Sequence, residues 1–293
     1  MALTIDVHVH PVARDMVRDT RNLRLLDRHA ACLAPTAAVD RLLERMDRGG
    51  IAWSCLMGPA PGDGMALTNA MVREAVAARP DRLIGFVGVD PVTQGADVTR
   101  DVIARAVTDW GFRGVGELAN VDLLDPQCEA VYETCSRLGV PLLVHLGVPL
   151  PSMLLKHGHP FALDEVAHRF PELQLIAAHA GMPWVVETVA VAARHDNVSI
   201  DISAITLFDE RAAGPIVSLC VQRGLGERLL FGSDFPLVDP ARYVQVVRRW
   251  QAGLLMRRLF RLPKLTRGQR DQVLGLNAAK LLGLAPVEGG AVP

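Results

Sequence analysis

The sequence predicts an α/β protein built as a (β/α)8 TIM barrel, and three observations support this fold class. Apolar runs of strand length alternate with segments of helical periodicity along the whole chain. Eight such runs are present, which is the number of strands that closes a barrel of this kind. The chain has 293 residues, a length within the range of one such barrel.

The expected strands are nearly continuous apolar runs, such as LIGFVGV and PLLVHL. This pattern is typical of parallel strands that are covered on both faces. The eight strands are expected at residues 4–9, 51–57, 83–89, 113–118, 140–146, 173–179, 198–203 and 229–233.

Several helices have recognisable ends. One is expected to begin after Thr36 and to stop at Gly49-Gly50, and another to begin at Pro126 and to stop at Gly139. The longest interruption, at residues 11–35, follows the first strand and is expected to form a pocket wall or lid.

No linker rich in Pro, Ser or Gly divides the chain. Residues 1–285 are therefore expected to form a single domain, and residues 286–293 a disordered tail.

The charge balance argues against a nucleic-acid partner or an anionic membrane surface, because 31 basic and 32 acidic residues give a net charge of −1. No apolar run reaches the roughly 18 residues that a membrane span needs. The basic, amphipathic segment 248–264 could be a membrane-surface helix, but a solvated helix is the favoured interpretation. The start of the chain lacks the basic region of a secretory signal, so a cytoplasmic protein is expected. The expected partner is a small-molecule substrate. This composition is also compatible with a homo-oligomer.

The five cysteines are odd in number and form no CxxC pair. This pattern indicates neither a disulfide framework nor a thiolate zinc site, so buried thiols are expected.

Six side chains able to bind a metal ion lie at or just after the ends of expected strands. Two of them, in the motif HVH, are two residues apart on the first strand and therefore share a face. The others take the corresponding place on strands four, five, six and eight, and the carboxyl ends of parallel barrel strands open on one mouth. The candidate metal ligands are His8, His10, Glu117, His145, His179 and Asp234.

Each of these residues also has a purely structural interpretation, which for His8 and His10 is that of alternating histidines on a polar strand face. His145 and His179 could be hydrogen-bonded core histidines, Asp234 could cap the following helix, and Glu117 could pair with Arg113. Six such residues at the carboxyl ends of expected strands favour a shared metal site over six separate structural roles.

The donor types indicate the ion and its chemistry. Imidazole and carboxylate groups without a thiolate suit zinc, or manganese where oxygen donors dominate, and one or two ions fit the set. A water molecule activated by the ion has its pKa lowered to about 7. Asp234 is the expected catalytic proton carrier, and His179 is expected to bind the ion or to stabilise a developing oxyanion.

The motifs HxH, LLVHLG, HAGxPW and GSDFP resemble those of the amidohydrolase superfamily, in the branch related to aminocarboxymuconate-semialdehyde decarboxylase. The resemblance covers essentially the whole chain and ends with LGLNAAKLLGL at residues 274–284. It implies a distorted (β/α)8 barrel of the metal-dependent hydrolase type, with His179 beside the metal-bound water. It also implies four metal ligands: His8, His10, His145 and Asp234.

One residue departs from the decarboxylases of that branch. They do not generally need a glutamate after strand four, whereas Glu117 occupies the place at which other superfamily members bridge two metals. This departure favours hydrolysis of an amide, lactone or ester bond by metal-activated water. The alternatives are nonoxidative decarboxylation of an unsaturated or aromatic acid, and a noncatalytic barrel with a structural metal.

Four residues are candidates for substrate contacts. Arg14 could bind a substrate carboxylate with two parallel hydrogen bonds, and His157 and His159 lie in the segment after strand five. Trp184 follows His179 and could form a wall of the pocket. Surface positions are the alternative for the arginine and the two histidines, and packing at the barrel rim is the alternative for the tryptophan.

Overall fold

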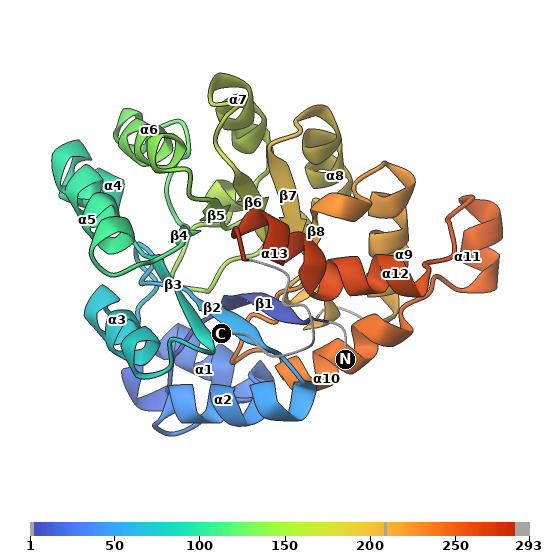
Figure 1. Ribbon diagram of the computed structural model, residues 1–293, viewed down its shortest axis with the longest axis horizontal. Coiled ribbons are helices and arrows are strands. Elements are labelled where there is room, and N and C mark those ends of the chain that lie inside the picture. Colours follow the sequence, from blue (N-terminus) through green and yellow to red (C-terminus); the bar gives the residue numbers. More distant parts are fainter. Residues whose placement is uncertain (1–2, 208–209, 285–293) are drawn as a thin grey trace.

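The computed structural model describes residues 3–207 and 210–284, and it confirms the predicted barrel (Figure 1). Eight parallel strands pair in chain order, each with the next. They are β1 (Ile5–Val9), β2 (Trp53–Leu56), β3 (Leu83–Val87), β4 (Gly114–Leu118), β5 (Leu142–Val144), β6 (Leu175–Ala177), β7 (Val198–Asp201) and β8 (Leu229–Leu230). The expected tail, residues 286–293, lies outside the described residues.

The two ends of the strand series meet, so the barrel is nearly closed. The backbone N–H of Val7 donates to the carbonyl of Phe231 at 2.9 Å, and Val9 forms a parallel bridge with Phe235. These contacts bring β1 beside the chain that follows β8. All eight predicted strand ranges contain an observed strand, although the observed strands are shorter.

Helices surround the ring of strands, and α13 lies across its centre in this view (Figure 1). The helices are α1 (Thr20–His29), α2 (Ala38–Gly49), α3 (Asn69–Ala78), α4 (Pro91–Gln94), α5 (Ala96–Thr108), α6 (Glu129–Leu138), α7 (Phe161–Arg169), α8 (Val185–Arg194), α9 (Glu210–Gln222), α10 (Pro240–Arg249), α11 (Leu254–Leu259), α12 (Arg267–Asp271) and α13 (Asn277–Leu281).

Local sequence explains several helix ends. Helix α6 ends before Gly139, as predicted, and this glycine adopts the left-handed conformation with φ of 65°. Asp19 begins α1 by accepting hydrogen bonds from the backbone N–H groups of Arg21 and Asn22. Helix α1 lies within the long interruption expected at residues 11–35, so part of that segment is ordered as a helix.

Two apolar cores hold the fold together. The smaller one fills the barrel with strand residues such as Val7, Met57, Phe86 and Ile176, and α13 adds Ala278. The larger one packs the surrounding helices against the outer face of the strands. All five cysteines are buried and unpaired, as expected. Within the described residues, every helix is too short or too polar to cross a lipid bilayer.

Candidate metal centre

The first two ligands come from β1, where the strand is irregular. The pairing register between β1 and β2 shifts between Asp6 and Val9, around His8. A similar shift between Val115 and Leu118, in the pairing of β4 with β5, surrounds Glu117. Irregularities of this kind re-aim side chains next to active sites, and here they occur at two candidate ligands.

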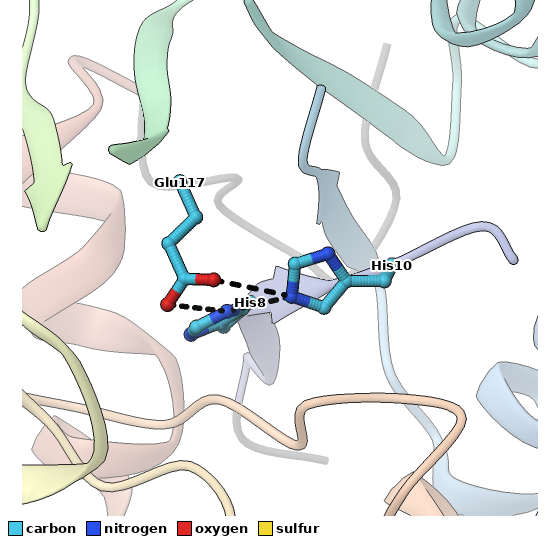
Figure 2. A group of neighbouring side chains, drawn as sticks. All are labelled: His8, His10 and Glu117. Atoms are coloured by element: carbon cyan, nitrogen blue, oxygen red, sulfur yellow. Dashed lines mark hydrogen bonds and ion pairs between the residues drawn. The ribbon is translucent and has the colours of Figure 1, made fainter. Parts of the chain in front are cut away.

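His8, His10 and Glu117 form a compact group (Figure 2). The Nε2 atoms of the two histidines lie 3.1 Å apart. The two carboxylate oxygens of Glu117 face them separately, with Oε1 lying 3.7 Å from Nε2 of His8 and Oε2 lying 3.7 Å from Nε2 of His10. The sequence prediction that His8 and His10 point to one place is therefore confirmed.

Glu117 also belongs to a second group, with His145 and His179. Its Oε1 lies 2.8 Å from Nδ1 of His145 and 3.5 Å from Nε2 of His179. The carboxylate thus stands between two sets of imidazoles, contributed by β1 on one side and by the ends of β5 and β6 on the other. The alternative pairing with Arg113 is absent, since the guanidinium of that residue donates to the carbonyl of Leu282.

Asp234 completes the cluster from the segment after β8. Its Oδ1 lies 3.4 Å from Nε2 of His10, and its Oδ2 lies 4.0 Å from Nδ1 of His179. Both Asp234 and His179 have positive φ values, 60° and 57°, a conformation that is strained for residues other than glycine. The next regular α-helix, α10, is capped by Asp239, so Asp234 does not act as its cap.

Two further residues, Asp201 and Ser203, orient the imidazoles of His8 and His179 by contacting their Nδ1 atoms. Asp201 Oδ2 lies 2.8 Å from Nδ1 of His8, and Ser203 Oγ lies 2.8 Å from Nδ1 of His179 and 2.5 Å from Asp201 Oδ2. With both Nδ1 atoms donating and the hydroxyl donating to Asp201, Nε2 of His8 and Nε2 of His179 face Glu117, where each can donate to the carboxylate when protonated or offer its lone pair to a cation when neutral. The sequence reasoning did not single out Asp201, although it ends β7 in the position that the other ligands take on their strands.

Electrostatics within the cluster are strongly coupled. Burial lowers the pKa of His8, but the charge of Glu117 and the hydrogen bond to Asp201 outweigh it and raise this pKa to about 10. Burial raises the pKa of Glu117, yet the charges of His145 and His8 hold it well below its usual range. The buried carboxylates therefore attract positive charge, whether it comes from protonated histidines or from a bound cation.

The residues present fit a divalent cation. Nε2 of His145 is buried without a hydrogen-bond partner, which indicates a lone pair available to a ligand that the protein itself does not supply. The donors are imidazole nitrogens and carboxylate oxygens, and such sets bind zinc or manganese.

The cluster closes one end of a cavity of about 320 Å³, a size suited to a small molecule. Five of the six predicted ligands line it, His8 being fully buried behind them. The other walls are mainly apolar and come from the segments after β1, β2, β5, β6, β7 and β8. They include Val12, Leu25, Leu26, Met65, Leu67, Val148, Leu150, Met153, Met182, Leu207 and Leu237.

The four residues suggested for substrate contacts lie outside the cavity lining. The guanidinium of Arg14 binds both carboxylate oxygens of Asp27, at 2.8 and 2.9 Å. His159 packs against Trp184, with ring centroids 5.0 Å apart, and His157 lies in a short 3-10 helix after β5. The lining instead contains Asp63, which the sequence reasoning missed because it lies in a loop six or more residues past its strand.

The sequence profile of the amidohydrolase family matches residues 5–284. The chain belongs to this family. The match confirms the predicted resemblance and includes all six candidate ligands. No curated protein sequence matches the chain.

Solved structures similar to this member of the family share its barrel. An uncharacterised TIM-barrel protein from Bordetella bronchiseptica is 22% identical, with 96% of this chain and 98% of that chain covered and a TM-score of 0.69. The 5-carboxyvanillate decarboxylase of Sphingomonas paucimobilis is 18% identical, with 97% and 100% covered and a TM-score of 0.69. A dihydroxybenzoic acid decarboxylase from Polaromonas sp. JS666, solved with manganese and 2-nitroresorcinol, is 17% identical, with 98% of each chain covered and a TM-score of 0.69.

These neighbours correct the expectation of hydrolysis. Most of the similar structures with an assigned activity are decarboxylases of aromatic acids, which agrees with the alternative drawn from the sequence. The hydrolytic interpretation depended on Glu117 as the bridge of a two-metal site. In the structure this carboxylate also binds His145 directly, so its presence alone does not imply attack by water.

Proposed function

We propose that this member of the amidohydrolase family is a metal-dependent, nonoxidative decarboxylase of an unsaturated or aromatic carboxylic acid. The observation that carries the proposal is the buried histidine and carboxylate cluster at one end of a cavity whose other walls are largely apolar. Such a cavity can bind the carboxylate of a substrate at the cluster and its flat, apolar body against the leucines and methionines. The decarboxylases with the same fold support this assignment.

The reaction needs few groups from the protein. The bond between the substrate carbon and its carboxylate breaks, carbon dioxide leaves, and the electron pair that remains on carbon takes up a proton. Apolar walls favour this step, because the negative charge of the carboxylate is lost when neutral carbon dioxide leaves and the carbon is protonated. They also restrict the access of water to the reacting carbon.

In this proposal His8, His10, His145 and Asp234 hold the ion, with Glu117 joining the two groups of imidazoles. The ion, when bound, supplies the positive charge that anchors the substrate carboxylate. Manganese is our first choice over the zinc expected from the sequence, since carboxylate oxygens contribute to the set and the Polaromonas enzyme holds manganese. Asp234 delivers the proton to the carbon, and His179 stands 4.0 Å from it as its proton-exchange partner.

The test is release of carbon dioxide by purified protein loaded with manganese or with zinc. The substrate panel contains 2,6-dihydroxybenzoate, 5-carboxyvanillate and unsaturated acids, beside lactones and esters. We expect carbon dioxide from at least one acid, and in deuterated water the product should carry one deuterium at the former carboxyl position. Asp234→Asn should abolish turnover. Conversion of a lactone or ester with no carbon dioxide from any acid would contradict the proposal.

A further inference from the structure

One carboxylate lines the cavity outside the metal cluster. The titratable side chains of the lining are those of His10, Glu117, His145, His179 and Asp234 in the cluster, together with His29 and Asp63. Among the described residues that line the cavity there is no lysine and no arginine. Away from the cluster, the cavity therefore offers a negative charge and the imidazole of His29, which is exposed at the end of α1.

Backbone groups hold the Asp63 carboxylate in place. Its Oδ2 accepts a hydrogen bond from the N–H of Ala60 at 3.0 Å, and its Oδ1 accepts one from the N–H of Met65 at 2.8 Å. The carbonyl of Asp63 accepts a further bond from the side chain of Asn22, at 2.7 Å. Asn22 is fully buried, and its amide also bonds the hydroxyl of Ser152 at 2.9 Å. Helix α1 and the loops after β2 and β5 thus fix the position of this group.

The carboxylate retains acceptor capacity. A carboxylate has about four lone-pair positions, and the two backbone N–H groups use two of them. Partial burial raises the pKa of Asp63, and the negative charge of Glu117 contributes in the same direction. A hydrogen-bond donor entering the cavity would relieve this unfavourable environment, whereas a second negative charge would aggravate it.

We infer that Asp63 determines substrate specificity by accepting a hydrogen bond from a hydroxyl or amino group of a substrate that carries a single carboxylate. The inference rests on the proposed function, which places the reacting carboxylate at the metal cluster. A second carboxylate elsewhere on the substrate would meet Asp63 and find no lysine or arginine on the described walls. At Asp63 the cavity therefore favours monocarboxylic acids with a donor group over acids that place a second carboxylate at this point.

Binding to the manganese-loaded protein, measured by calorimetry, tests this without any turnover. The probes are benzoate, 3- and 4-hydroxybenzoate, 4-aminobenzoate, 4-methoxybenzoate and terephthalate. We expect the best hydroxyl or amino compound to bind about tenfold or more tightly than benzoate, as for a hydrogen bond to a charged group. The methoxy compound should lose this advantage because it cannot donate, and terephthalate should bind more weakly than benzoate.

Asp63→Asn should act in opposite directions on two probes. The preference for a hydroxyl over benzoate should shrink severalfold, while terephthalate should bind more tightly than it does to the parent, because the repelling charge is gone. If the substitution unfolded the loop that carries Asp63, both probes would instead bind more weakly. Asp125→Asn is the matched control, since Asp125 is also half-buried and accepts a backbone bond, from Gln127 at 2.8 Å, but lies outside the cavity.

Equal binding of the hydroxy and methoxy compounds by the parent protein, or an unchanged ranking in Asp63→Asn, would overturn the inference, as would failure of every benzoate to bind. These results are distinct from failure of the proposed function. Selective binding of donor compounds with no carbon dioxide from any acid would refute decarboxylation and retain Asp63 as a specificity residue. Release of carbon dioxide from acids regardless of whether they carry a donor group would support decarboxylation and refute the role of Asp63 in specificity.

Discussion

The imidazole of His8 is held at both of its ring nitrogens. Nδ1 lies 2.8 Å from Asp201, and Nε2 faces His10 and Glu117. The residue is fully buried, so its removal would leave the buried carboxylate of Asp201 without its imidazole partner. Its role as a ligand can be separated from its role in packing by measuring bound metal directly.

His8→Ala should lose most of its bound ion, because one of the converging nitrogens is gone. The measurement is elemental analysis of protein purified in the presence of manganese. His168→Ala is the control, since His168 is exposed on α7, away from the cluster, and its metal content should match that of the parent. Equal metal in all three proteins would show that His8 is not a ligand.

Asp201 contacts the cluster through His8 and through Ser203, whose hydroxyl lies beside His179. Asp201→Asn should weaken metal binding about 10–100-fold, the usual effect of losing a carboxylate behind a ligating histidine. Asp201 also faces the buried carboxyl of Asp6, whose pKa burial raises to about 7 with a contribution from Asp201. Removing the Asp201 charge relieves that repulsion.

Competitive titration with a chelating dye measures the affinity, and thermal unfolding of the metal-free protein measures stability. The expected combination is weaker binding with little loss of unfolding temperature. Unaltered affinity would leave Asp201 a structural residue, and a large loss of stability would mean that its packing role dominates.

At the level of elements, β8 can approach its neighbours because Gly232 follows it. A Cβ atom at this position would lie 2.3 Å from Oδ1 of Asp201 and 2.9 Å from Cβ of His8. Both neighbours are fully buried and cannot move freely. The small residue in the GSD motif is therefore needed to bring Asp234 next to the ligands of β1.

Gly232→Ala should destabilise the protein by about 1–3 kcal/mol, as expected for overpacking, and should reduce metal affinity because His8 is displaced. Denaturant unfolding and metal titration provide the two measurements. In Gly253→Ala the new methyl group would have no atom within 4 Å, and the φ of −56° suits alanine, so this variant is the control. If Gly232→Ala and Gly253→Ala both behave like the parent, the site accommodates a methyl group at position 232, and a glycine is not needed there.

The strands and the six candidate ligands were predictable because both depend on patterns that are local in sequence. At both His145 and Asp234 the sequence shows an apolar run followed by a polar group. Parallel topology then brings the ends of these strands together. The cavity wall was not predictable in the same way. Asp63 lies in a loop and Asn22 in α1, and their positions depend on contacts between segments up to 130 residues apart.

The candidate metal centre brings together residues from distant parts of the barrel. They come from β1 and β4 and from the segments after β5, β6 and β8. An ion bound by all of them would link chain segments that separate on unfolding. Binding to the folded state alone stabilises a protein by mass action, by about 2.7 kcal/mol when the free ion is at about 100 times its Kd. For a chain of this size, each kcal/mol shifts the unfolding temperature by about 2–4 °C.

Removal of the ion by a chelator should therefore lower the unfolding temperature by several degrees, and restoring manganese should return it. The size of the shift should grow with the free manganese concentration, since the effect follows mass action. In His8→Ala the chelator should have little effect, because there is little ion to remove, whereas His168→Ala should respond like the parent. Scanning calorimetry at several manganese concentrations provides the measurement. A shift that persists in His8→Ala would place the stabilising ion somewhere other than this cluster.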